Sequence, residues 1–259
     1  MEPNTYSPTW HAVFGTTQPE EVLAHEIAFI ARVLPLPGHR AVLDVCCGAG
    51  RHLARLSALG YEVTGIERDP AVVQAARVAA PAAHVVEGDV SRLSELVQGP
   101  FDGIVCLWAS FGYGPPEENA ALLGAMAGLL RPGGRLVLDV YNRAFFEIHA
   151  GERTIERAGR SILDRTELAG DRLTSTVDYG SGIEDLFSWQ VFTPAELEVL
   201  AGTLGLTPVL SCARFDGRVA PSPESARMQH VLALGPAREV RPRARHAAWL
   251  NQHPASRSR

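Results

Sequence analysis

The sequence predicts an α/β fold built on a mostly parallel, doubly wound sheet within a single domain. Short, fully apolar runs alternate with stretches of helical periodicity between residues 41 and 140. Apolar strands that alternate with helices are typical of a parallel sheet covered on both faces. A later helix is followed by two further apolar runs, 206–215 and 227–234, which would add an antiparallel edge to that sheet. The chain length of 259 residues is compatible with one decorated domain.

The first half of the chain divides into elements in a regular order. Amphipathic spacing predicts a helix from Pro19 to Leu34. The expected strands are Ala41–Cys46, Glu62–Ile66, His84–Val86, Gly103–Trp108 and Arg135–Val140. The expected helices between them are Arg51–Leu59, Ala71–Ala80, Ser91–Val97 and Glu117–Leu130. The turn Arg131–Gly134 ends the last of these helices, because proline and glycine cannot continue it.

The second half has a different texture. Turn signals at Gly170-Asp171 and at 180–182 separate β-prone runs, which predicts antiparallel hairpins. Thr193 and Glu196 form a capping box with Pro194 at the first helical position, so a helix should run to about Leu204. We therefore expect one domain over 1–235, with a helical N-terminal segment 1–38, a ligand-binding core 39–142, substrate-side hairpins 143–192 and a C-terminal helix and strands 193–235.

The composition excludes several classes of function. All 24 basic residues are arginine, which rules out a lysine Schiff base or a lysine general base. The chain from Pro236 onward carries six arginines and one acid, although the net charge of the whole is -5. The remaining body is therefore acidic, which argues against a nucleic-acid surface. We expect 236–259 to be a basic, flexible tail; an arm docked on a partner subunit, and hence a homodimer, is the alternative.

The sequence also bears on location. No run of ~18 apolar residues is present, so we expect no membrane span. The N-terminus MEPNTYSPTWH lacks the basic and then apolar pattern of a signal peptide. The four cysteines form no C-x-x-C pair, which suits free thiols in a reducing cytosol. We expect a cytoplasmic protein.

The stretch VLDVCCGAG, residues 42–50, places a glycine turn between a strand and a helix. Ligands of doubly wound sheets bind beyond the carboxyl ends of the strands, and Gly48 and Gly50 would let backbone amides approach one. Glu67 ends the second strand, where a carboxylate accepts hydrogen bonds from ribose hydroxyls. Asp89 ends the third, where it could meet an adenine amino group. Asp44 lies within the first strand and either braces the turn or holds an ammonium group, because a lone buried acid is costly.

A nicotinamide dinucleotide is the rival ligand for this turn. Its fingerprint, G-x-G-x-x-G, uses the third glycine for close packing of helix on strand. Leu53 stands at that position, and Arg51-His52 are bulkier than a pyrophosphate cradle prefers. A dehydrogenase is therefore disfavoured but stays open.

The series of motifs resembles that of the class I S-adenosylmethionine-dependent methyltransferases. It comprises Asp44-x-x-x-Gly48-x-Gly50, Glu67, Gly88-Asp89 and Arg131-Pro-Gly-Gly134, in the family's order and spacing. Ser110-Phe-Gly-Tyr113 is similar to the segment after the fourth strand in small-molecule members, including antibiotic sugar N-methyltransferases. Cys46-Cys47 is a departure, since many members have glycine or alanine there.

The resemblance implies a fold, a cofactor and a set of residues. The fold is a seven-stranded Rossmann-like sheet with an antiparallel last strand, and the cofactor is S-adenosylmethionine. Leu107 and Trp108 would lie against its methionine end. The residues implied for the cofactor are Asp44, Cys46, Gly48, Ala49, Gly50, Glu67, Arg68, Asp89, Val90, Leu107 and Trp108.

The implied reaction is in-line transfer of a methyl group to a small-molecule acceptor, which depends more on alignment than on a base. His11, Tyr113 and His149 are the candidates to orient or deprotonate the acceptor. Asp139 and Asn142, at the end of the fifth strand, do not complete a metal site, so we expect no metal.

Two alternatives stand beside this function. Enzymes that methylate amino groups of nucleic acids place Asn/Asp-Pro-Pro-aromatic after the fourth strand to grip a flipped base. Leu107-Trp-Ala-Ser-Phe111 occupies that place here, which favours a small molecule. The second alternative is a protein that binds the cofactor without methylating, as a sensor, a partner subunit or another catalyst.

Overall fold

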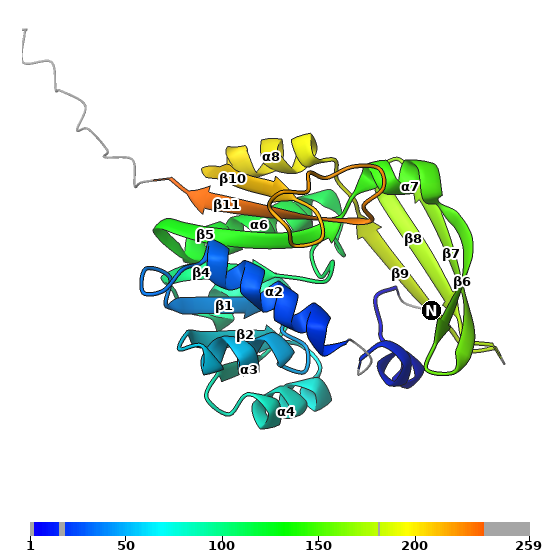
Figure 1. Cartoon of the computed structure of the whole chain (residues 1–259), viewed down its shortest axis with the longest axis horizontal. Helices are drawn as coiled ribbons and strands as arrows, with labels where there is room; N and C mark the ends of the chain where they lie inside the picture. The colour runs from blue at the N-terminus through cyan, green and yellow to red at the C-terminus, as the bar shows by residue number, and fades with distance from the viewer. Residues whose placement is uncertain (1–2, 16–18, 181, 236–259) are drawn as a thin grey trace, which may run out of the picture.

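The computed structural model describes residues 3–15, 19–180 and 182–235. They form a seven-stranded sheet covered by helices and a second, four-stranded sheet that stands beside it (Figure 1). The predicted basic tail, 236–259, lies outside the described residues. In the part of the chain that is described, no helix is long and apolar enough to cross a membrane.

The main sheet has the strand order β10-β11-β5-β4-β1-β2-β3. Its strands are β1 (Ala41–Val45), β2 (Glu62–Glu67), β3 (His84–Glu87), β4 (Phe101–Cys106), β5 (Leu130–Tyr141), β10 (Leu206–Cys212) and β11 (Arg227–Leu234). Strands β1 to β5 are parallel, and β11 runs antiparallel to both β5 and β10. The predicted fold class, with its antiparallel last strand, is confirmed, and the strand order reverses between β1 and β4.

Alternation along the strands sends side chains into two separate cores. Leu43 and Val45 of β1 belong to one core, and Val42 belongs to the other. The first is covered by η2 (Val90–Arg92), α5 (Leu93–Leu96), α6 (Pro116–Leu129) and α8 (Pro194–Thr203), and the second by α2 (Glu20–Val33), α3 (Arg51–Ala58) and α4 (Pro70–Ala79). Asp44 shares a strand face with Val42, so its side chain faces α2 and α3.

Several boundaries differ from the sequence expectation. Strand β4 spans Phe101–Cys106 instead of Gly103–Trp108, and β10 ends at Cys212 instead of Phe215. Strand β5 begins at Leu130 instead of Arg135, because the chain extends directly after α6 and Leu130 pairs with Phe101. The turn 131–134 is therefore part of the strand, with Gly133 in the left-handed region at φ 79°. The helix expected over 91–97 divides into the short 3₁₀ helix η2 and α5.

The second sheet consists of β6 (Gly151–Arg157), β7 (Arg160–Ala169), β8 (Arg172–Asp178) and β9 (Glu184–Gln190), all antiparallel. The predicted hairpins are confirmed; α7 (Arg143–His149) and β6 precede them and were not predicted as separate elements. The N-terminal α1 (Pro8–Trp10) and η1 (His11–Gly15) pack on one face of this sheet through an aromatic and aliphatic cluster. This packing brings the N-terminal segment beside the main sheet (Figure 1).

Candidate functional site

The candidate site lies at the carboxyl edge of the main sheet, where the strand order reverses. The loop after β1 has left-handed backbone at Cys46 (φ 63°), Gly48 (54°) and Gly50 (79°). A Cβ on Gly48 would meet no atom within 4 Å, whereas one on Gly50 would lie 3.1 Å from Ala76. The loop is thus packed tightly on α4 at one glycine and leaves open space at the other, where a ligand can approach the backbone.

Leu53 occupies the position of the third glycine in the dinucleotide fingerprint G-x-G-x-x-G, and Gly65 makes room for it. A Cβ on Gly65 of β2 would lie 2.7 Å from both Leu53 Cδ1 and Cys47 Sγ. The strand therefore supplies the glycine that lets α3 approach the sheet, and fully buried Leu53 fills the space. Cys47 packs under the loop, and burial raises the pKa of its thiol, so it serves as a small apolar group.

Glu67 ends β2 with its carboxylate turned toward the glycine loop. Its Oε2 accepts a hydrogen bond from the Gly48 amide at 3.2 Å. Its Oε1 accepts from the amides of Arg68 at 2.8 Å and Asp69 at 3.0 Å. The carboxylate is thereby fixed in place while half-buried, and the remaining lone pair of Oε2 can accept a hydroxyl donor.

Asp44 is a buried acid with one unsatisfied oxygen. The residue is only 2% exposed, and its Oδ2 has no hydrogen-bond partner among the described residues. Burial raises the pKa of Asp44 to about 6, although the charges of His52 and Arg51 lower it. Of the two predicted roles, holding an ammonium group would satisfy Oδ2, and no hydrogen bond to the turn does so.

At the end of β3, Asp89 is exposed and caps η2. Its Oδ1 accepts a hydrogen bond from the Ser91 amide at 2.8 Å, and bonds to Ser91 lower the pKa of the carboxyl group. Val90 is half-buried beside it. The guanidinium of Arg68 donates to the Asn4 carbonyl, which ties the N-terminal segment to the end of β2.

After β4, buried Leu107 is followed by Trp108, whose ring has two arginine neighbours. The guanidinium carbons of Arg51 and Arg227 lie over the ring, 4.4 and 4.2 Å from its centroid. Trp108 has φ 57° and Ala109 φ 55°, a strained pair of left-handed residues of the kind that clusters at functional sites. The indole Nε1 is buried without a partner among the described residues.

Two buried acids lie beside the arginine neighbours of this tryptophan, Asp139 beside Arg227 and Glu26 beside Arg51. Asp139, fully buried, pairs with Arg227 through Oδ2, which also accepts from the Trp108 amide at 2.9 Å. Burial raises the pKa of Asp139, although the charge of Arg227 lowers it. Glu26 of α2 accepts a hydrogen bond at 2.8 Å from His52 Nε2, taking the ring as donor there. Burial would raise the pKa of Glu26, but the bond to His52 brings it below its ordinary value.

The candidates for the acceptor side fall into two places. The hydroxyls of Tyr113 and Tyr6 are hydrogen-bonded to each other, and the rings of Tyr6 and His11 lie 6.0 Å apart. Burial raises the pKa of Tyr6 to about 12 and that of Tyr113 well above its ordinary value. His149 is exposed at the end of α7, where its Nδ1 bonds the Phe145 carbonyl at 2.9 Å. The structure therefore places both Tyr113 and His11 beside Tyr6, whereas His149 lies at the surface.

Sequence reasoning missed Tyr6, Glu26, Arg214 and Arg227. Glu26 had a signal, because an acid stands among the apolar positions Leu23, Ile27 and Ile30 of one helix face. The others come from segments distant in sequence and carry no local pattern. Among the described residues, no three His, Cys, Asp or Glu side chains gather as metal ligands would.

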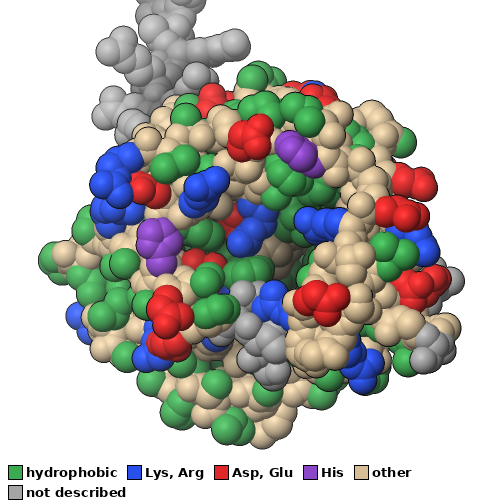
Figure 2. Space-filling view, turned by 45° about the vertical axis from the view of Figure 1, so that its right-hand side comes forward, with side chains coloured by type: hydrophobic (Ala, Val, Ile, Leu, Met, Phe, Trp, Pro, Cys, Tyr) green, Lys and Arg blue, Asp and Glu red, His purple; other side chains and the backbone are tan. Residues whose placement is uncertain are grey.

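One face of the molecule is hollowed, and arginine side chains gather around the hollow (Figure 2). Two adjoining cavities, of roughly 190 and 320 Å³, share Arg214, Phe215 and Arg227 in their walls. The smaller also has Gln229 and Ser225, and the larger is closed by the first turns of α2. Arg227 belongs both to these cavities and to the ring contact with Trp108, so the cavities adjoin the end of β4.

The fold defines a class: a doubly wound α/β protein with an open glycine loop at the carboxyl edge of its sheet, beside Asp44 within β1, Glu67 at the end of β2 and Asp89 after β3. A sequence profile of the methyltransferase domain family matches residues 42–134. The methyltransferase domain match thus covers the segment that holds the glycine loop and the acids Asp44, Glu67 and Asp89.

Curated proteins that the chain resembles are methyltransferases as well. The chain is 32% identical over 139 residues to a ubiquinone biosynthesis O-methyltransferase of Xylella fastidiosa, covering 52% of this chain and 55% of that one. It is 31% identical over 169 residues to a dTDP-4-amino-2,3,4,6-tetradeoxy-D-glucose N,N-dimethyltransferase of Saccharopolyspora spinosa, covering 61% and 66%. The matched region thus spans little more than half of the first relative and just under two thirds of the second.

Solved structures share the fold. The CcbJ methyltransferase from Streptomyces caelestis has a TM-score of 0.70 at 22% identity and covers 84% of this chain and 90% of that one. CalS10, an amino pentose methyltransferase from Micromonospora echinaspora, has a TM-score of 0.65 at 23% identity and covers 90% and 100%. At such identities the likeness concerns the fold.

Proposed function

We propose that this protein transfers a methyl group from S-adenosylmethionine to a small-molecule acceptor in a biosynthetic reaction. The observation that carries the proposal is the set of carboxylates at or near the carboxyl ends of three strands, Asp44, Glu67 and Asp89, around one open glycine loop. The unpartnered oxygen of Asp44 is the sharpest feature of that set, because a buried carboxylate needs a donor. The ammonium group of the cofactor's methionine part is a donor of the required kind.

Each residue of the site has a proposed role. Glu67 binds the ribose hydroxyls, accepting one of them through the free lone pair of Oε2, and Asp89 with Val90 contacts the adenine. Asp44 holds the ammonium group, with Leu107 and Trp108 against the methionine end. The loop residues Cys46, Gly48, Ala49 and Gly50 line the approach to the cofactor, and Arg68 closes it from the end of β2. When bound, the cofactor supplies a methyl group on a positively charged sulfur.

On the acceptor side, the residues of this chain orient the acceptor and exclude water, and they contribute less by moving protons. The raised pKa values of Tyr6 and Tyr113 keep both phenols protonated near neutral pH, so they can position an acceptor by hydrogen bonds. A neutral amine acceptor needs no base, because alignment supplies most of the acceleration. His11 remains in the proposed acceptor region, and His149, being exposed, is left out of it.

The names of the relatives support a small acceptor, since they include an amino-sugar N,N-dimethyltransferase and a ubiquinone biosynthesis enzyme. The four cysteines are free thiols, which supports the proposed cytoplasmic location. We also retain, as proposals, a single domain over 1–235 and the alternative of a homodimer.

The first experiment is titration calorimetry with S-adenosylmethionine and with NADH. We expect saturable binding of the former only; tight NADH binding without a response to S-adenosylmethionine would overturn the proposal in favour of a dehydrogenase. The second is a screen of small-metabolite extracts with cofactor labelled in its methyl group. Transfer of label defeats the alternative of a cofactor-binding protein that does not methylate, and binding without transfer to any fraction favours it.

A further inference from the structure

We infer that the acceptor carries an anionic group, phosphate-like or carboxylate, and that Arg214 and Arg227 form the subsite that binds it. That the anion belongs to the methyl acceptor rests on the proposed function. The anion subsite itself follows from the residues that line the two cavities. Both cavities have these two arginines in their walls, and Arg227 reaches from there to Trp108 at the end of β4.

Arg214 is held in place by its backbone. It has φ 59° and the next residue, Phe215, φ 53°, two successive left-handed positions. His25 Nε2 lies 2.9 Å from the Arg214 carbonyl, and the Phe215 amide donates to Gln229 Oε1 at 2.8 Å. The tip of this loop is therefore fixed to α2 and to β11. These backbone contacts hold Arg214 at the wall of the cavities.

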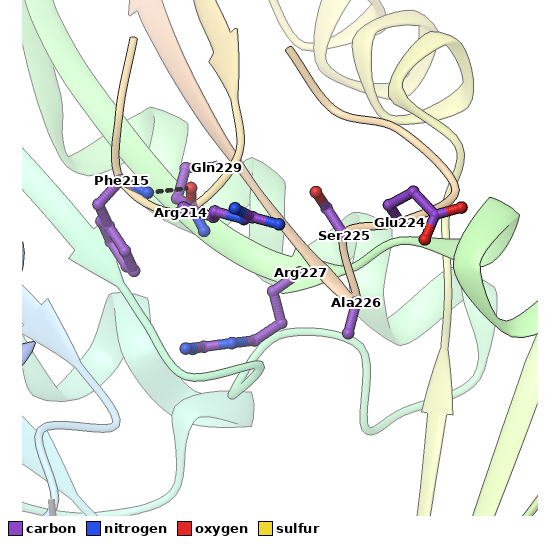
Figure 3. Close-up of a pocket in the computed structure, with 7 residues that line it drawn as sticks. All are labelled: Arg214, Phe215, Glu224, Ser225, Ala226, Arg227 and Gln229. Carbon is purple, nitrogen blue, oxygen red and sulfur yellow. Dashed lines mark hydrogen bonds between the residues drawn. The ribbon is translucent and has the colours of Figure 1, made fainter. Parts of the chain in front are cut away.

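The guanidinium of Arg214 is available for a ligand. No ion pair or hydrogen bond involves it among the described residues, and the residue is exposed. It extends across the smaller cavity toward Ser225, while the carboxylate of Glu224 points away from both guanidinium groups (Figure 3).

Arg227 supplies the buried side of the subsite. Its side chain is 25% exposed, and its Nη1 pairs with Asp139, which fixes the guanidinium over Trp108. The other guanidinium nitrogen atoms remain for a ligand, since arginine carries five donors. The position of Arg227 is thus set by protein contacts before any ligand arrives.

The acids near the cavities do not neutralise this pair of arginines. The Oε2 atom of Glu26 is bonded to His52 and lies 3.9 Å from Arg51, whose positive charge offsets this acid, although Oε1 has no hydrogen-bond partner among the described residues. Glu21 is exposed at the start of α2. Asp139 offsets one guanidinium, so the second positive charge, that of Arg214, is left for a ligand. Planar guanidinium groups bind carboxylates and phosphates through paired N–H donors, which identifies the ligand group as an oxyanion.

The test measures binding of simple oxyanions to the full chain saturated with S-adenosylhomocysteine. Inorganic pyrophosphate represents a phosphorylated acceptor and succinate a carboxylate acceptor. The variants are Arg214→Gln, Arg214→Lys and the matched control Arg218→Gln. Arg218 lies in the same loop, is 90% exposed and pairs with Asp216 at 2.8 Å, outside both cavities.

We expect one of the two anions to bind, about tenfold or more weaker in Arg214→Gln, intermediate in Arg214→Lys and unchanged in Arg218→Gln. Preference for pyrophosphate assigns a phosphorylated acceptor, and preference for succinate a carboxylate. The inference is overturned if neither anion binds the saturated chain or if the control loses as much as Arg214→Gln. An anion that binds the chain without S-adenosylhomocysteine but not the saturated chain would show that the arginines serve the cofactor, which also overturns the inference.

The two proposals fail separately. If S-adenosylhomocysteine binds and the anions do not, methyl transfer stands and the anionic acceptor is wrong. If S-adenosylhomocysteine does not bind, the proposed function is wrong, whatever the anions do in its absence.

Discussion

Replacement of Glu67 by glutamine tests the cofactor site with little change of shape. In the structure, Oε1 accepts two backbone amides and Oε2 accepts one, from Gly48. The glutamine oxygen can keep the first two bonds, so its NH₂ group faces Gly48 and one hydrogen bond is lost. We expect a cost in stability of about 0.5–1.5 kcal/mol.

Binding should suffer more than stability. The substitution removes the charge and replaces one acceptor that a ribose hydroxyl would use. A hydrogen bond to a charged group is worth about 1.5–3 kcal/mol, which corresponds to a loss of affinity of about 10- to 150-fold.

The assay is titration calorimetry with S-adenosylhomocysteine, together with urea denaturation of the same samples. Glu62→Gln is the matched control, because Glu62 begins the same strand at the opposite edge of the sheet and pairs only at the surface, with Arg40. Equal dissociation constants for Glu67→Gln and wild type would refute the assignment of the ribose site. So would an equal loss in both variants.

Three further outcomes are expected. Because burial raises the pKa of Asp44 to about 6, the carboxylate becomes neutral below that pH, and affinity for S-adenosylhomocysteine should fall between about pH 7 and pH 5. Calorimetry of Asp44→Asn should show a weaker dependence of affinity on pH. A wild-type affinity that does not change with pH would contradict the role of Asp44 in holding the ammonium group. Gly50→Ala should destabilise by about 1–3 kcal/mol in urea, because it combines φ 79° with a 3.1 Å contact. Gly124→Ala, in mid-helix with its nearest contact at 3.6 Å, should stabilise by about 0.5–1 kcal/mol. Changes in the free energy of unfolding of the same sign for the two variants would contradict this reasoning. Arg227→Gln should destabilise by about 3 kcal/mol in urea, because Asp139 is left buried without its charge partner, and a neutral effect would show that Asp139 is protonated.

The fold could be predicted because its signals are local. Apolar runs and helical periodicity recur along 41–140, and consecutive carboxylates follow strands whose ends meet at one edge. Parallel connectivity alone therefore places Asp44, Glu67 and Asp89 near one another. The capping box at Thr193 likewise predicted the start of α8 within a residue, because its hydrogen bonds are all within one turn.

The acceptor side could not be predicted in the same way. Arg227 reaches Trp108 only because β11 inserts between β5 and β10, and Tyr6 reaches Tyr113 only because the N-terminal segment packs on the second sheet. His149 matched the sequence criterion for an acid–base residue, yet the direction of α7 turns it to solvent. None of these outcomes leaves a periodic signal.

The amino-acid sequence by itself determined the sheet, the glycine elbow and the acids at its strand ends, since each follows from neighbours a few residues apart. Only the tertiary structure decided which charged side chains lack a partner within the described part of the chain, Asp44 and Arg214, and which have one, Glu26 and Asp139. Pairing of charges depends on how distant segments meet, and burial then decides how much a missing partner costs.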